Sequence, residues 1–149
     1  MIANVWAGDT LAATITRDRT GTTFQYLAEY KLSDLPAIAT TLPKDAPSIT
    51  LPPGQLPAFF AGLLPEGRRL SALKRSVKTS ADDDLGLLLS VGENTVGNVS
   101  VLPEGREPTI IPGSVDLSND GVDFSPVLAA AGVGDPHALA GVQDKASAR

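Results

Sequence analysis

The chain has 149 residues, no cysteine and a formal net charge of −5. The lack of cysteine excludes disulfides and thiolate metal sites, and the negative charge argues against a general nucleic-acid-binding protein. Its first residues lack the positive charge of a leader peptide, and no apolar run approaches the length of a membrane span. We therefore expect a cytoplasmic protein with no membrane partner, built as one domain and part of the next.

The first part of the chain predicts antiparallel strands. In Thr10–Thr16 aliphatic residues alternate with threonine, and in Thr22–Tyr30 the aromatic residues fall on one face. Such a two-residue period is typical of strands with one buried face, and the hairpin spacing predicts a three-stranded meander over residues 1–32. Five prolines then interrupt residues 33–55, where only Ser48–Leu51 can form a strand, at an edge or beside the meander.

Three short helices are expected next. The apolar residues of Leu56–Leu64 lie at steps of 3, 4, 7 and 8 from the first, which is one stripe of a helix. A second stripe runs over Leu70–Val77, and a third over Leu85–Leu89. Ser80, three residues before Asp83, predicts a capping box at the start of the third helix.

The rest of the chain completes an α+β prediction. Asn98–Leu102 alternates as a strand, so we expect a small antiparallel sheet or partial barrel packed with the three helices. The resulting division is a subdomain over residues 1–104, a linker over residues 105–124 rich in Pro, Gly, Asp and Ser, and the start of a second unit over residues 125–149.

Two charged clusters have structural explanations. The consecutive carboxylates Asp82–Asp84 suit the positive end of a helix dipole better than a cation site. Five of the twelve basic residues fall within Arg68–Lys78. The favoured interpretation is that this run forms the solvated face of an amphipathic helix. The alternative is that it contacts an acidic protein or nucleic-acid phosphates.

The tail offers one candidate binding loop. In Ala140–Lys145 a glycine among small residues lets backbone N–H groups approach phosphate oxygens, and a lysine supplies positive charge. The spacing is neither that of a Walker loop nor that of GxGxxG. From spacing alone, an ordinary loop and a phosphate-binding loop therefore both remain open, and the single His137 beside a proline adds no metal site.

Three stretches together point to a family. Phe59–Gly67 (FFAGLLPEG), Val91–Val99 (VGENTVGNV) and Leu139–Lys145 (LAGVQDK) occur in this order along the chain. Together they resemble the N-terminal region of HipA-type serine/threonine kinases, the toxins of bacterial HipBA toxin–antitoxin pairs. The resemblance implies a small α+β subdomain in front of a kinase-like core.

The resemblance also implies a nucleotide site. In the family the segment matching Leu139–Lys145 is the phosphate-binding loop over ATP, so the expected cofactor-binding residues are Gly141, Val142, Gln143, Asp144 and Lys145. Family members can eject this loop when a serine just before it is autophosphorylated. Ala138 stands at that position here, which puts autophosphorylation at this site in doubt.

Phosphoryl transfer needs groups that this chain does not show. The catalytic-loop Asp and Asn and the metal-binding Asp of a kinase have no counterpart before Arg149. We therefore expect no catalytic residue here, no activity from this chain alone, and binding of ATP and Mg²⁺ only in a complete kinase. The implied partners are a HipB-like antitoxin and the remainder of the kinase or a second kinase chain, with DNA contacted only indirectly through the antitoxin.

A second function remains open at this stage. Some systems divide the family between two chains, and a small chain resembling this subdomain would then bind and restrain a separate HipA-like kinase chain. Such a chain would be an antitoxin-like regulatory subunit. A scaffolding subunit without nucleotide chemistry is a third interpretation.

Overall fold

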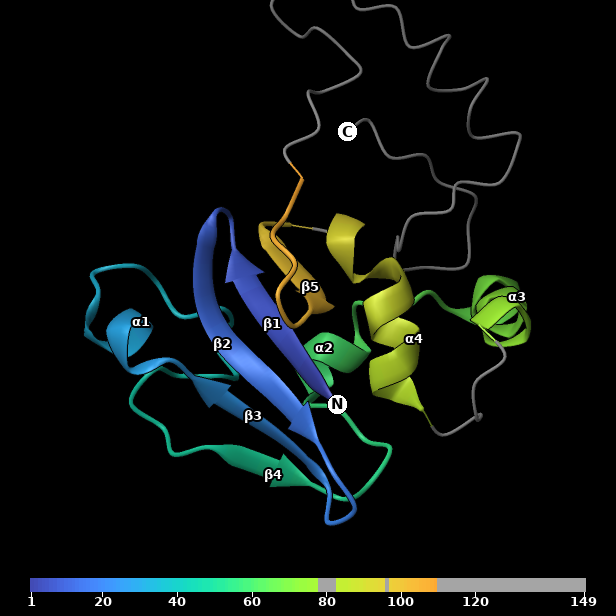
Figure 1. The fold of residues 1–149 in the computed structure, drawn as a ribbon, viewed down its shortest axis with the longest axis horizontal. Coiled ribbons are helices and arrows are strands. Elements are labelled where there is room, and N and C mark those ends of the chain that lie inside the picture. The colour runs from blue at the N-terminus through green and yellow to red at the C-terminus, as the bar shows by residue number, and fades with distance from the viewer. Residues whose placement is uncertain (78–82, 96, 110–149) are drawn as a thin grey trace, which may run out of the picture.

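A five-stranded antiparallel sheet forms the framework of the chain. The computed structural model describes residues 1–77, 83–95 and 97–109. In it the strands are ordered β4-β3-β2-β1-β5 (Figure 1). Their bounds are β1 Ile2–Ala7, β2 Thr10–Arg17, β3 Thr22–Tyr26, β4 Ile49–Leu51 and β5 Val99–Pro103.

The predicted meander is confirmed. Val5 of β1 lies opposite Ala13 of β2, which in turn lies opposite Tyr26 of β3. The predicted strand at Ser48–Leu51 is also present, because β4 pairs with β3 at the edge of the sheet. β4 has only three residues, between Pro47 and Pro52.

The last strand closes the other side of the sheet. β5 pairs with β1 in antiparallel register, with Val5 opposite Val101 and Ala7 opposite Val99. The predicted strand at Asn98–Leu102 is therefore confirmed, shifted by one residue. This pairing joins segments from the two ends of the described chain.

The expected strand over Thr22–Tyr30 is too long. β3 ends at Tyr26, and the chain turns into α1, Ala28–Leu32. The error has a physical reason, since residues four apart share a face both in a strand and in a helix. Tyr26 and Tyr30 are stacked at 5.7 Å between ring centroids across this change of structure.

Three helices and one 3₁₀ turn follow β4. They are α2 Ala58–Ala61, α3 Gly67–Val77, α4 Asp84–Val91 and η1 Gly92–Asn94. The helix expected over Leu56–Leu64 is a single turn, because Pro57 begins it and Gly62 ends it. Leu63 and Leu64 still reach the core, from turns whose N–H groups bond three residues back.

One face of the sheet meets the helices in a single core. Phe24 of β3 packs against Phe60 of α2 at 5.4 Å between ring centroids, and both are at most 2% exposed. Leu85, Leu87 and Leu88 of α4 join the same buried cluster. α2 and α4 therefore pack on the sheet through apolar side chains, whereas α3 packs against α4 and contributes only partly buried side chains.

The start of α4 is tied to β2. The Asp83 carboxylate accepts a hydrogen bond from the Gly86 N–H at 2.9 Å and thereby caps the helix. The same carboxylate pairs with the Arg17 guanidinium. Asp83 itself is therefore the cap of this helix, and Ser80 of the predicted capping box lies outside the described residues. The part of the expected linker beyond Thr109, and the second unit expected after it, also lie outside them.

Two substitutions separate the cap of α4 from its ion pair. Asp83→Ala removes both, and we expect it to lower the free energy of unfolding by about 1–3 kcal/mol. Asp83→Asn keeps a side-chain oxygen for Gly86 N–H and loses only the charge, so its cost should stay below about 1 kcal/mol. Urea unfolding measures both values. Equal losses from the two variants would show that the cap contributes nothing.

Candidate functional site

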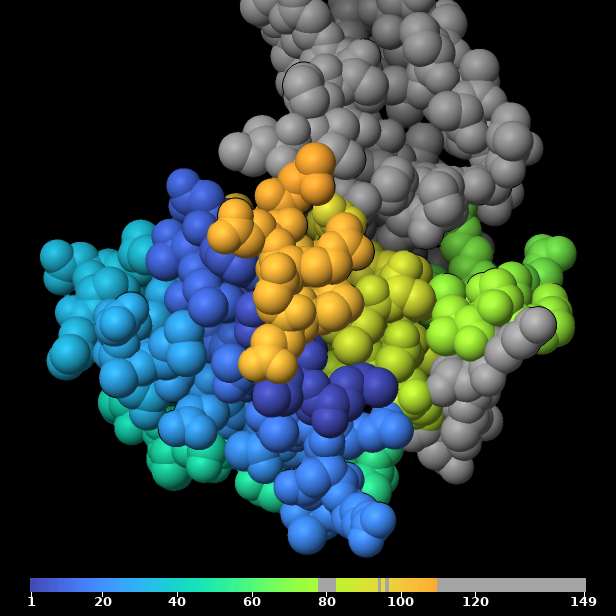
Figure 2. Space-filling view, in the orientation of Figure 1, coloured from blue at the N-terminus to red at the C-terminus, as the bar shows by residue number. Residues whose placement is uncertain are grey.

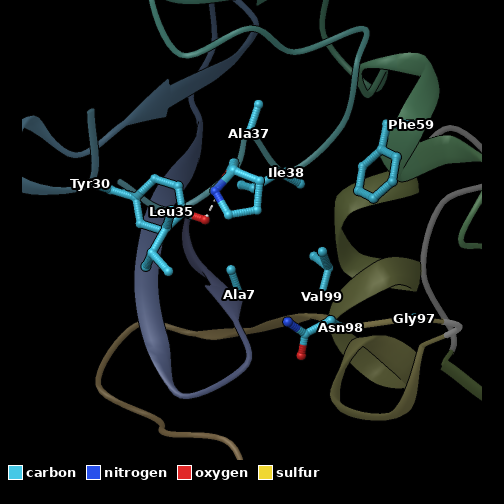
Figure 3. A pocket seen from close by; sticks show the side chains of 10 residues that line it. Ala7, Tyr30, Leu35, Ala37, Ile38, Phe59, Gly97, Asn98 and Val99 are labelled. Atoms are coloured by element: carbon cyan, nitrogen blue, oxygen red, sulfur yellow. Dashed lines mark hydrogen bonds between the residues drawn. The ribbon is translucent and has the colours of Figure 1, made fainter. Parts of the chain in front are cut away.

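Two of the three stretches that carry the family resemblance meet at one pocket. Phe59 begins the first stretch, and Gly97, Asn98 and Val99 end the second; all four line a cavity of about 320 Å³ (Figure 3). The remaining lining residues come from β1, α1 and the loop that follows α1, namely Ala7, Tyr30, Leu35, Pro36, Ala37 and Ile38. Segments far apart in the sequence therefore form a shared surface.

α2 directs its two phenylalanines to different places. Phe60 is fully buried in the core, whereas Phe59 is only partly buried and lies on the wall of the pocket (Figure 3). The two rings meet edge to face at 5.1 Å between centroids. Because successive helical residues point about 100° apart, one turn of helix is enough to anchor Phe60 and present Phe59.

A tyrosine pair holds the loop that forms the opposite wall. The Tyr26 hydroxyl accepts a hydrogen bond from the Ile38 N–H at 2.8 Å and donates one to the Leu42 carbonyl at 2.7 Å. The Tyr30 hydroxyl donates to the Pro36 carbonyl at 2.9 Å. Burial raises the pKa of both hydroxyl groups, so both remain protonated donors at neutral pH.

Two lysine side chains also hold this loop, through hydrogen bonds to its backbone carbonyls. Lys44 Nζ donates to the carbonyl oxygens of Ser33 at 2.7 Å and Leu35 at 2.8 Å, and lies 5.1 Å from the centre of the Tyr30 ring. Lys31 Nζ donates to the Ala46 carbonyl at 2.9 Å. These bonds satisfy backbone carbonyls of a segment that has no regular partner, so the pocket wall is held without a helix or strand.

The second wall depends on the turn before β5. Gly97 has a φ of +92°, a conformation that L side chains rarely adopt. The following Asn98 accepts a hydrogen bond from the Gly8 N–H at 2.8 Å through its carbonyl, which ties this turn to the β1–β2 hairpin. Asn98 also brings the one side-chain amide into the pocket lining.

The lining of the pocket is mostly apolar. It has one phenol and one amide, but no carboxylate, imidazole, thiol or serine hydroxyl. Leu35 of the lining is 43% exposed, and Leu32, three residues earlier, is 88% exposed. An apolar hollow next to exposed leucines is typical of a surface that receives apolar side chains of another segment. The described part of the chain also holds no group of three metal-ligating side chains.

Most of the site residues predicted from the sequence cannot be placed. The expected phosphate loop, Gly141, Val142, Gln143, Asp144 and Lys145, lies outside the described residues, as do Ala138 and His137. Asp83 and Asp84 are found at the start of α4, as expected from the helix dipole. The basic run up to Val77 forms α3.

Sequence reasoning missed the pocket itself. Its wall at Leu35–Ile38 lies in the proline-interrupted segment, for which only one short strand was expected. The available signal was the four-residue spacing of Tyr26 and Tyr30 just before this segment, since buried tyrosines need hydrogen-bond partners.

No helix among the described residues is long and apolar enough to cross a bilayer.

Removal of the Tyr26 hydroxyl tests how the pocket wall is held. Tyr26→Phe leaves the Ile38 N–H and the Leu42 carbonyl without this partner, so we expect a loss of about 1–3 kcal/mol in the free energy of unfolding. Tyr30→Phe removes one hydrogen bond and should cost about 1 kcal/mol. Urea unfolding gives both values. A Tyr26→Phe variant no less stable than Tyr30→Phe would contradict this account.

The two tyrosines also predict an alkaline dependence. Their pKa is raised in the folded state, so folding favours the neutral phenol. That contribution is complete below the ordinary tyrosine pKa of 10.0 and is lost as the pH rises through the raised folded value. We expect unfolding free energy to fall above about pH 10 and to fall less steeply in Tyr26→Phe. Identical slopes would contradict the prediction.

Comparison with known proteins agrees with the observed fold. A structure of the Shewanella oneidensis toxin–antitoxin complex of HipA, HipB and operator DNA aligns with 74% of this chain and 25% of its matching chain. The TM-score is 0.57 and the sequence identity is 24%. At this identity, the match establishes a shared fold for the aligned region.

Two curated relatives each match about two thirds or more of the sequence. The putative kinase Y4mE of Sinorhizobium fredii is 31% identical over 110 residues, which cover 72% of this chain and 26% of the relative. The serine/threonine-protein kinase toxin HipA of Shewanella oneidensis is 28% identical over 100 residues, covering 66% and 22%. The matching region thus spans about a quarter of each relative. The HipA N-terminal domain family matches residues 3–102, and the chain belongs to this family.

Proposed function

We propose that this chain is the N-terminal part of a HipA-type serine/threonine kinase toxin that works with a HipB-like antitoxin. The family match and the names of both relatives support this proposal. In this function the sheet and helices support a kinase core that the rest of such a protein supplies. The core would carry the phosphoryl-transfer groups, which are not among the residues of this chain.

The pocket gives the chain a specific task in that assembly. The single observation that carries this proposal is the meeting of Phe59 and Asn98, each from a family-identifying stretch, in one apolar cavity. We assign the pocket and the neighbouring Leu32 and Leu35 as the contact surface for a partner chain. Burial of such a leucine stabilises an interface by about 1.5–3 kcal/mol when its pocket is well filled.

The tail supplies the second proposed task. Residues 141–145 combine backbone N–H groups, one glycine that allows close approach and one ammonium group beside the Asp144 carboxylate, and the N–H and ammonium donors fit the phosphates of ATP. The amides of Gly141 to Gln143 would bind phosphate oxygens, and Lys145 would neutralise their charge. Mg²⁺ bound with ATP would offset further phosphate charge, and its protein ligands would come from the kinase core.

Charge placed at the pocket tests the proposed contact surface. Leu35→Asp puts a carboxylate beside the apolar cavity, and we expect it to weaken binding of the purified HipB-like antitoxin at least about tenfold. Ile2→Asp is the matched control, because Ile2 is 38% exposed, against 43% for Leu35, and lies on β1 outside the pocket lining. Calorimetric titration measures both affinities. Equal affinities for the two variants would overturn the assignment.

Two substitutions in the tail test the phosphate loop. In the full-length kinase, Gly141→Asp places a negative charge against the phosphates, and Lys145→Ala removes a positive one. We expect each to raise the Kd for ATP at least about tenfold. Ser147→Ala, just beyond the loop, should leave the Kd unchanged. Unchanged ATP binding in all three variants would show that this loop is not the phosphate site.

A further inference from the structure

α3 presents a basic face that the proposed function does not use. The helix carries four basic side chains over Gly67–Val77 and no acidic one. After Gly67, its exposed residues follow helical spacing on one side, at steps of 3, 4, 7 and 8 from the first: Arg68, Ser71, Ala72, Arg75 and Ser76. Leu70, Leu73 and Val77 are half-buried against the core on the other side.

Arg68 and Arg75 differ from most basic side chains of the described chain. Arg17 pairs with Asp83, and Arg106 pairs with Glu93 at 3.1 Å. Lys31 and Lys44 donate to backbone carbonyls. Among residues 1–77, 83–95 and 97–109, no ion pair or hydrogen bond engages the Arg68 or Arg75 guanidinium. Both cations are therefore available to an external anion.

The position of Arg68 is not explained by helix stability. It lies in the first turn of α3, which contains no acidic residue. A cation at the positive end of the helix dipole is destabilising, by about 0.3–1 kcal/mol at exposed sites. Arg75, in the last turn, is favourably placed by the same argument. Arg68 and Arg75 are better explained together, as two cations that bind one anionic ligand.

The face between the two arginines can lie close to an extended anion. Arg68 and Arg75 are seven residues apart, so about 10 Å of helix rise separates them. The exposed residues between them, Ser71 and Ala72, have small side chains. α3 also lies at the margin of the molecule beside α4, where Figures 1 and 2 show it standing out from the sheet.

We propose that this face, Arg68 with Arg75, contacts the phosphate backbone of DNA when an antitoxin holds the chain on its operator. The inference rests on the proposed function and extends it, because the chain then contacts DNA directly. Regularly spaced phosphates suit two separate guanidinium groups, each of which can bind two phosphate oxygens at once. Such contacts add affinity without reading sequence.

The test uses the complete toxin–antitoxin complex and a labelled operator duplex. The affinity is measured between 50 and 200 mM KCl for the natural complex, Arg68→Ala, Arg75→Ala and Arg19→Ala. Arg19 is an exposed arginine in the β2–β3 turn, so its variant changes the net charge equally. Each phosphate contact contributes about 0.9 to the slope of log affinity against log salt. We expect each α3 variant to flatten that slope by about 0.9 and Arg19→Ala to leave it unchanged.

The possible results are distinct. Slopes equal to that of the natural complex in both α3 variants overturn the proposal while leaving the toxin–antitoxin function intact. Loss of antitoxin binding in the α3 variants, with an unchanged slope for the complex that still forms, also overturns it and assigns the face to an acidic protein surface. Failure of the natural chain to form a complex counts against the proposed function instead.

A second measurement does not need the antitoxin. The chain itself is titrated at low salt with a 16-base-pair duplex, and backbone amide signals are followed by nuclear magnetic resonance. Shifts centred on α3 that disappear in the Arg68→Ala, Arg75→Ala double variant support the proposal. Shifts that persist in this variant, or no α3 shifts at saturating duplex, overturn it.

Discussion

The pairing of β5 with β1 is the constraint on which the other features depend. It places Val101 opposite Val5 and brings the turn at Gly97–Asn98 against the β1–β2 hairpin. It also requires Gly92, because a Cβ atom there would lie 2.3 Å from the Val101 carbonyl oxygen. The end of α4 can therefore approach the sheet closely only with glycine at this position. α3 in turn packs against α4.

The pocket follows from this pairing and from the tyrosine pair. One wall is fixed by β5, the other by hydrogen bonds from Tyr26 and Tyr30, and α2 adds Phe59 between them. The lining that results is mostly apolar, with one phenol and one amide among its side chains. This composition agrees with the proposed role of the pocket as a contact surface, and the proposed nucleotide-binding residues 141–145 lie in a separate part of the sequence.

Local patterns predicted the strands and helices well, and long-range contacts less well. Alternating residues were sufficient for β2 and β5 and for the existence of β3 but not its end, and helical spacing was sufficient for α3 and α4. Tyr30 was assigned to a strand because its spacing from Tyr26 fits both structures, and hydrogen bonding decides between them. The pocket wall at Leu35–Ile38 depends on side chains that bond distant carbonyls, which no local pattern contains. The loop residues 141–145 stay a prediction.

The short strand β4 restricts how other chains can attach. Extended peptides often join a protein by adding a strand to an open edge, and that route needs a run of free N–H groups. β4 has three residues between prolines, which are too few backbone groups for another strand to pair with. At the opposite edge of the sheet, β5 is contacted by η1. Among residues 1–77, 83–95 and 97–109, the edges of the sheet thus offer little backbone for strand addition, which favours attachment of a partner through side chains.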